Sequence, residues 1–341
     1  MKDKKKTILN SIIFLFLIFV TYYIIFRGQN IYRMYKQINE LNIFYVIIAV
    51  IIMLIYYLTE AINVKNILTV FKEKISLLKM LRYTFVSFFF SSITPGATGG
   101  QPMEVYYLKK EGIKVSNSTM AILIHLCGYH FSSIIFAIIG VTIMPEVLNN
   151  GVLYFFIFGT LLNLIPVTAT IIGIFFPKLA VKIVGLLIKL LKSLKIKNIE
   201  DISEKINTEL EIYQQSANYI KNNLKSFLHA MLLSTINMIL YYSVPFFIYK
   251  AFGLSGKTII DIVLLQAIIH GTVCSMPLPG TVGVTETVFL LVYDMIYPSH
   301  LLQSALLVNR FINFYLFVFV SLVVYIITKI KLDNKKNSLK Q

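Results

Sequence analysis

Residues 81–108 read LRYTFVSFFFSSITPGATGGQPMEVYYL, and this stretch decides the fold. It starts as an apolar run, Leu81–Ile93, is interrupted at residues 94–102, and resumes over Met103–Leu108. Neither arm has the roughly 20 residues that a membrane-spanning helix needs. Proline and glycine at this density end a helix, and broken backbone at membrane depth is tolerated only where protein buries it or a cavity borders it. The stretch therefore predicts a re-entrant hairpin.

A second stretch repeats this pattern in the other half of the chain. The apolar run Ile259–Met276 is followed by PLPGTVG at residues 277–283 and then by Val284–Tyr297. Both interruptions contain P-G-x-x-G, at Pro95–Gly99 and at Pro279–Gly283. One copy of this pattern is common in turns, but two copies at matching positions indicate an internal repeat. Two helix kinks without a binding role are the alternative.

The composition places the hairpins in a membrane protein. Hydrophobic residues make up 57% of the 341 residues and charged residues 14%, against about 45–50% and 25% in soluble domains. This excludes a soluble enzyme and a disordered or fibrous chain, and the continuous apolar runs exclude an outer-membrane barrel. We expect an all-α polytopic membrane protein with about six spanning helices, at Thr7–Phe26, Ile43–Thr59, Asn117–Ile143, Val152–Phe176, Phe227–Tyr249 and Leu301–Thr328. The first is expected to be an uncleaved span.

The basic residues fix an orientation for these elements. If both hairpins are re-entrant and the N-terminus is cytoplasmic, the cytoplasmic segments hold 26 of the 32 lysines and arginines. This split predicts cytoplasmic termini and one integral domain over residues 1–341. Its halves, about 43–143 and 227–330, form an inverted repeat of the kind found in transporters. Residues 177–225 form a cytoplasmic amphipathic connector. Charge bias leaves open the alternative that the second hairpin is two full spans.

The two interruptions are also the predicted site. Glycine lets backbone approach a ligand closely, and a helix that begins after each tip directs its N–H groups at an anion. Pro102 suits the first position of one such helix, and Thr285 is expected to cap the other. The predicted lipid-binding residues are Pro95, Gly96, Gly99, Gly100, Gln101, Glu104, Pro279, Gly280, Gly283, Glu286 and Arg310.

Arg310 is the strongest single candidate, because it lies inside an apolar span, where a charge is expensive. A guanidinium binds phosphate in a bidentate manner. The alternatives are a buried ion pair with Asp294 or Glu286, or a side chain that extends to the membrane surface. The carboxylates at membrane depth are Glu60, Glu104, Glu286 and Asp294, and each is a candidate to receive a headgroup amine. Glu60 lies at a span end, where a solvated position is expected instead.

Histidines and cysteines suggest no metal site. His125 and His130 lie five residues apart, which is not the spacing of a helical metal pair, so a place in the core or interhelical hydrogen bonds are expected. Cys127 and Cys274 lie in apolar stretches, and packing is expected of both. No cofactor signature is present in the sequence.

At its two hairpins the chain resembles the transmembrane domain of the lysylphosphatidylglycerol synthase/flippase family, also called multiple peptide resistance factor. The residues that carry the resemblance are 94–102, Pro279–Gly283 with Glu286, and Asn309-Arg310-Phe311, and the similarity extends over residues 7–330. The family often has an acidic residue where Gln101 stands and a glycine where Ala97 stands.

The resemblance implies a function as well as a fold. The full-length proteins make lysylphosphatidylglycerol and flip it to the outer leaflet, which lowers sensitivity to cationic peptides. Their soluble C-terminal domain transfers lysine from charged tRNA. This chain ends shortly after its last span, so we expect the flippase half alone, translocating a phospholipid across the bacterial plasma membrane.

Two alternatives stay open at this point. One is phosphatidylglycerol lysyltransferase activity, with charged tRNA as the nucleic acid bound or with a separate transferase acting in trans. The other is a non-transporting lipid-binding protein. In every case the expected partners are the bilayer and a phospholipid headgroup.

Overall fold

The computed structural model describes residues 30–149, 151–193, 218 and 221–338, and within these ranges all regular secondary structure is helical. Five of the described segments are long and apolar enough to cross a membrane: α3 (Ile43–Val70), α6 (Val115–Ile143), α7 (Val152–Phe175), α10 (Leu224–Ala251) and Ser299–Leu332. The last combines α13 (Ser299–Arg310), the π-helical turn η4 (Phe311–Tyr315) and α14 (Leu316–Ser338). The predicted span Thr7–Phe26 lies outside the described residues. The chain is thus a polytopic helical membrane protein.

Three predicted spans agree closely with α6, α7 and α10, but α3 does not end at Thr59 as expected. It continues to Val70 because Ala61, Val64 and Leu68 recur at helical spacing and are buried. Glu60 therefore lies inside a long helix, and the expectation of a solvated span end is wrong for it.

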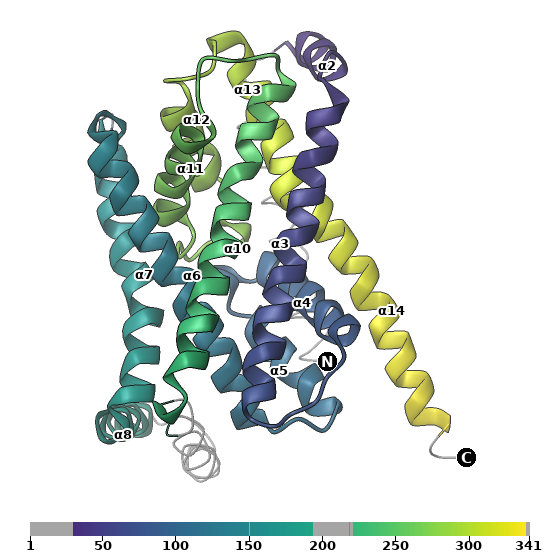
Figure 1. Ribbon diagram of the computed structural model, residues 1–341, viewed down its shortest axis with the longest axis vertical. Helices are drawn as coiled ribbons and strands as arrows, with labels where there is room; N and C mark the ends of the chain where they lie inside the picture. The colour runs from purple at the N-terminus through teal and green to yellow at the C-terminus, as the bar shows by residue number, and fades with distance from the viewer. Residues whose placement is uncertain (1–29, 150, 194–217, 219–220, 339–341) are drawn as a thin grey trace.

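Each predicted hairpin is a pair of short helices joined by a break. The first consists of α4 (Leu77–Ser92), η1 (Pro95–Ala97) and α5 (Gly100–Lys110), and the second of α11 (Ile259–Val273), η3 (Pro279–Thr281) and α12 (Val284–Tyr293). The helices have 16, 11, 15 and 10 residues, so each is shorter than a span requires. The two helices of each pair pack together, and η1 contacts η3 near mid-height between the other helices (Figure 1).

The two breaks share their backbone conformation at the second and third residues of P-G-x-x-G and differ at the fourth and fifth. Gly96 and Gly280 both have φ 58°, and the residues that follow them, Ala97 and Thr281, have φ 56° and 50°. Glycine adopts this left-handed region at little cost, whereas alanine and threonine rarely enter it. The matching geometry explains why glycine stands second in both P-G-x-x-G copies.

The helix starts after the breaks differ from expectation. Helix α5 begins at Gly100, so Pro102 is not its first residue and Glu104 lies beyond the first turn. Helix α12 begins at Val284, and its cap is formed by Glu286, whose Oε2 accepts a hydrogen bond from the Gly283 N–H at 2.6 Å. Thr285 instead pairs its hydroxyl with that of Thr281, so the expected Thr285 cap is wrong.

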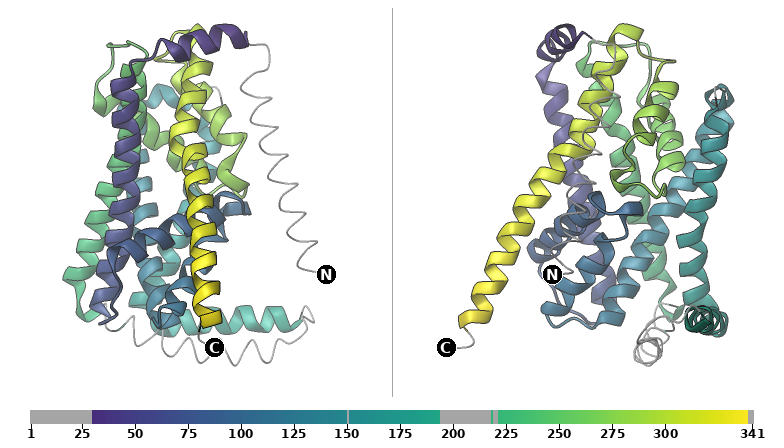
Figure 2. Two further views of the ribbon diagram at one scale, coloured as in Figure 1. Left: turned by 90° about the vertical axis from the view of Figure 1, so that its right-hand side faces the viewer. Right: turned by 180° about the vertical axis from the view of Figure 1, so that it is seen from behind.

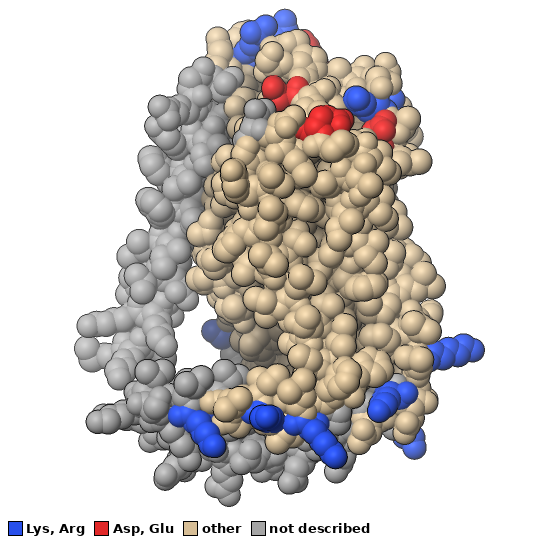
Figure 3. All heavy atoms as spheres, turned by 90° about the vertical axis from the view of Figure 1, so that its left-hand side faces the viewer, with Lys and Arg blue, Asp and Glu red and all other residues tan. Residues whose placement is uncertain are grey.

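Two further helices mark the opposite ends of the molecule. Helix α2 (Ile31–Asn39) lies crosswise at the upper end and α8 (Pro177–Ser193) at the lower end (Figure 2). The short turn η2 (Pro145–Leu148) joins α6 to α7. On the face in Figure 3, lysines and arginines gather along the lower edge, and the acidic side chains lie near the upper end.

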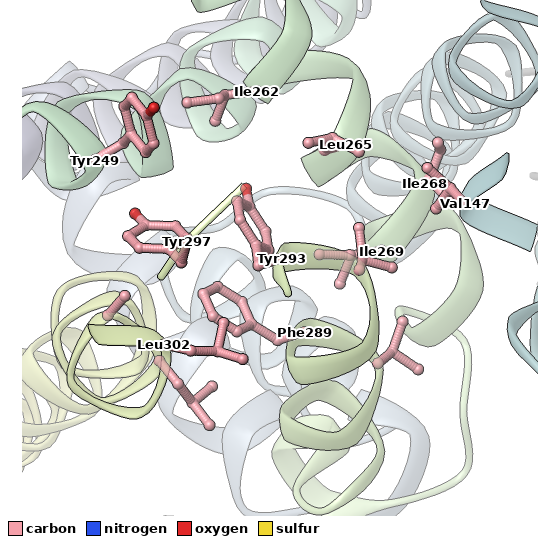
Figure 4. Packing of buried hydrophobic residues seen from close by; sticks show 14 of the residues in the cluster. Val147, Tyr249, Ile262, Leu265, Ile268, Ile269, Phe289, Tyr293, Tyr297 and Leu302 are labelled. Carbon is pink, nitrogen blue, oxygen red and sulfur yellow. The ribbon is translucent and has the colours of Figure 1, made fainter. Parts of the chain in front are cut away.

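Glycine contacts fix the second hairpin to its neighbours. Gly159 of α7 lies so close to the Thr272 carbonyl of α11 that a Cβ has no room there, and a Cβ on Gly140 of α6 would meet Ile268 at 2.9 Å. Beside this contact, aromatic and aliphatic side chains of α10, α11, α12 and α13 form a buried cluster around Tyr293 (Figure 4). Helix α11 is thereby packed on three sides, which positions η3 at the centre of the molecule.

Candidate functional site

A cavity of about 620 Å³ lies where the two breaks meet, and we call it the central cavity. Its wall includes residues of α3, α4, α6, α10 and α11 together with both breaks and Arg310. A volume of this size falls within the range of small-molecule sites. A cavity with both apolar and polar side chains in its wall thus lies at the place where the sequence predicts a site.

The predicted site residues divide into two groups around this cavity. Five of them border it: Gly96, Gln101, Glu104, Gly280 and Arg310. The other six do not border it: Pro95, Gly99, Gly100, Pro279, Gly283 and Glu286. Gly99 and Gly100 instead lie against Thr94 and Ser91 of the same hairpin, where a Cβ would clash. These glycines therefore allow the hairpin to close upon itself.

Arg310 forms a buried ion pair with Glu286, the alternative that the sequence left open. The Arg310 Nε lies 2.7 Å from the Glu286 Oε1, and the two side chains are 9% and 0% exposed. Arg310 Nη2 also donates a hydrogen bond to the Gly280 carbonyl at 3.1 Å. Asp294, the other proposed partner, is exposed at the end of α12. One arginine thus joins the end of α13 to the break and to the cap of α12.

The π-helical turn η4 follows Arg310 directly and holds its surroundings in place. The Phe314 ring lies under the guanidinium, with 4.7 Å between the carbon and the ring centroid, and it fills the space where Gly280 lacks a side chain. Asn313 faces the central cavity and donates a hydrogen bond to Asn309. π-Helical turns occur often at functional sites, and no local sequence signal predicts this one.

The opposite side of the central cavity carries two carboxylates. Glu60 lies 3.8 Å from the Nε2 of His125, while Glu104 is 3% exposed and lies beside Ser87. One carboxylate oxygen of Glu104, Oε1, has no hydrogen-bond partner. The described residues give neither carboxylate a lysine or arginine partner. This side of the cavity therefore presents two carboxyl groups that no lysine or arginine of the described structure pairs.

Histidines of α6 and α11 form the remaining polar wall. His270 contacts the hydroxyls of Tyr129 at 2.7 Å and of Ser133 and Tyr242 at 3.0 Å. His125 lies 3.3 Å from the Nδ2 of Asn63. These contacts confirm interhelical hydrogen bonding as the role predicted for His125.

Asn163 of α7 is the centre of a second hydrogen-bonded group. Its Oδ1 lies 2.8 Å from the Nδ1 of His130 and accepts hydrogen bonds from Cys274 and Ser275, while its Nδ2 donates to the Gly271 carbonyl. The interhelical role predicted for His130 is also confirmed. Among residues 30–149, 151–193, 218 and 221–338, no three His, Cys, Asp or Glu side chains are arranged to hold a metal ion.

Sequence reasoning expected a solvated position for Glu60, which borders the cavity, and it missed the cavity residues Tyr56 and Gln266. The signal that could have placed Glu60 is the helical spacing of buried apolar residues beyond it. Tyr56 and Gln266 lie in apolar runs without a local feature that distinguishes them from core residues.

Comparison with known proteins places the chain in a family. A family model described as "Lysylphosphatidylglycerol synthase TM region" matches residues 7–321. The chain is also 24% identical over 325 residues to a protein of Archaeoglobus fulgidus described as "UPF0104 membrane protein", with 93% of this chain and 96% of that protein covered. The family match spans both breaks, the central cavity and Arg310. The chain therefore belongs to the family of the lysylphosphatidylglycerol synthase transmembrane region.

Proposed function

We propose that the chain translocates a phospholipid with an amine-bearing headgroup, such as lysylphosphatidylglycerol, between the leaflets of the bacterial plasma membrane. The observation that carries this proposal is the placement of two acidic side chains on one wall of the central cavity. Glu60 and Glu104 lie on one side without a lysine or arginine partner among the described residues, and Arg310 is already paired with Glu286 on the other. A cationic group of the ligand would favour the ionised form of these two carboxyl groups and so bind beside them.

The arrangement suggests how a headgroup is held. Its amines meet Glu60 and Glu104, where charge-assisted hydrogen bonds are about twice as strong as neutral ones. Its phosphate lies toward Arg310, whose guanidinium it must share with Glu286. The amine contacts thus supply the selectivity, because the arginine is already neutralised.

The fold supplies a means of moving such a headgroup. We propose that both hairpins are re-entrant, that residues 43–143 and 227–330 form an inverted repeat, and that both termini are cytoplasmic. The equal φ angles of Gly96 and Gly280 and the equal lengths of α3 and α10, 28 residues each, support the repeat. In transporters with such repeats one half rocks against the other around a fixed midplane site. Here that site is the central cavity.

The test uses the purified chain in proteoliposomes that contain lysylphosphatidylglycerol in one leaflet. An amine-reactive, membrane-impermeant reagent measures how quickly the lipid becomes accessible. We expect Glu60→Gln/Glu104→Gln to slow translocation by roughly 100-fold or more, because it removes two charge-assisted contacts worth about 1.5–3 kcal/mol each. The control is Glu146→Gln, which removes an exposed carboxylate outside the cavity.

Other outcomes separate the alternatives. Wild-type rates in the Glu60→Gln/Glu104→Gln variant would refute the proposed amine contacts. Binding of the lipid without movement in the wild-type chain would favour a lipid-binding protein. Formation of lysylphosphatidylglycerol from phosphatidylglycerol and lysyl-tRNA by the chain alone would establish a lysyltransferase.

A further inference from the structure

A second hollow lies outside the central cavity, between α5 and α14 at the lower end of the molecule. It has a volume of about 460 Å³, and we call it the lysine groove. Its walls include Met103, Tyr106 and Lys110 of α5 and Tyr325, Lys329 and Leu332 of α14. Nothing in the proposed function uses these residues.

Helix α5 separates the lysine groove from the central cavity. Gln101 and Glu104 face the cavity, whereas Met103, Tyr106 and Lys110 face the groove. The far wall is held by α4, because the Tyr325 ring stacks on Phe89 with the centroids 5.5 Å apart. Helix α14 is thereby packed against α4, and its lower end stands away from the bundle, as Figure 1 shows.

The charge of the groove is positive and lacks a carboxylate counterpart. None of the described ion pairs involves Lys110 or Lys329, and both side chains are exposed. The Lys110 Nζ lies 4.6 Å above the centroid of the Tyr106 ring, and this cation–π contact directs the ammonium along the groove wall. Two lysines on facing helices are suited to bind one phosphate group between them.

The surroundings indicate that this phosphate belongs to a lipid. Ile326 and Ile330 of α14 flank Lys329 and are 46% and 54% exposed. The groove itself has an aromatic and aliphatic lining, and tyrosines with lysines at one level are typical of the membrane interface. A soluble phosphate would use only the lysines, whereas a phospholipid also covers the exposed isoleucines with its acyl chains.

We propose that the lysine groove is a docking site for the phosphate of an anionic phospholipid, in the leaflet at the lysine-rich end and beside the central cavity. Docking does not require translocation, so this inference can hold or fail separately from the proposed function.

The test is a titration of the purified full chain in detergent micelles with phosphatidylglycerol, followed by native mass spectrometry. We expect Lys110→Gln/Lys329→Gln to weaken binding about 10-fold or more, because each lysine at a membrane surface contributes appreciably to anionic lipid binding. The matched control is Lys109→Gln/Lys331→Gln. It removes the same charge from the same two helices, at exposed positions outside the groove.

The outcomes are distinct. Weaker binding in the groove variant, with the control variant unchanged, supports the proposal. Equal binding by wild type and groove variant would overturn it, as would an equal loss in both double variants, which shows only general charge attraction. Displacement of the lipid by glycerol phosphate at matching concentration would overturn the lipid assignment, because a soluble phosphate would then suffice.

Discussion

The buried pair of Arg310 and Glu286 should determine the stability of the second hairpin, and a double-mutant cycle can measure its contribution. The variants are Glu286→Gln, which keeps an oxygen to cap Gly283, Arg310→Met, which keeps a long side chain, and the two combined. At the 2.7 Å separation between Nε and Oε1, two unit charges attract by about 6 kcal/mol at an effective dielectric constant of about 20. Desolvation of both groups offsets much of this.

Removing one partner leaves the other charge buried and unpaired. Each single variant should therefore lower the free energy of unfolding by about 3–5 kcal/mol. The combined variant buries no charge, so it should be less destabilised than the sum of the two by about 1–3 kcal/mol. Unfolding in mixed detergent micelles, followed by far-ultraviolet circular dichroism, gives these values. Additivity within about 0.5 kcal/mol would refute the reasoning, because it would mean that the two charges do not sense each other.

Two further experiments test the packing and the central cavity. Gly159→Ala should lower the free energy of unfolding by about 1–3 kcal/mol in the same assay, since its Cβ meets the Thr272 carbonyl. The control is Gly185→Ala, at a helical position with open space around it, which should raise the free energy of unfolding by about 0.5–1 kcal/mol. Equal effects of the two variants would contradict the close α7–α11 contact. Cys274 borders the central cavity, whereas Cys127 does not and is 1% exposed. A small hydrophilic thiol reagent should therefore modify Cys274 before Cys127, and peptide mass spectrometry can measure the order. The reverse order would mean that water does not reach the cavity.

The sequence predicted those parts of the fold that local chemistry determines. Proline and glycine interrupt a helix wherever they stand, so both breaks could be placed from the sequence within a few residues. Apolar length defined α6, α7 and α10 almost to the residue. The end of α3 was misplaced because a single carboxylate, Glu60, was taken as a boundary, although helical burial continued to Leu68. A charge inside a long apolar helix marks a cavity as readily as a membrane surface.

The candidate site could be predicted only in part, because its charges depend on tertiary pairing. From the sequence, Glu286 and Asp294 were both possible partners of Arg310. The fold decides between them by burying Glu286 completely and leaving Asp294 exposed at the other end of α12. Glu286 in turn uses its second oxygen to cap Gly283, which a sequence pattern assigns as readily to Thr285.

This pairing changes the role that Arg310 can play in recognition. A guanidinium whose Nε faces a carboxylate and whose Nη2 bonds to the Gly280 carbonyl brings little net charge to a ligand. Its position at the junction of α13, η3 and the cap of α12 suits it instead to hold the break in place, so that any ligand phosphate competes with a structural contact. Glu60 and Glu104 have no such partner among the described residues and face the same cavity. Selectivity for a headgroup should therefore originate at these two carboxylates, with the arginine setting the geometry against which they act.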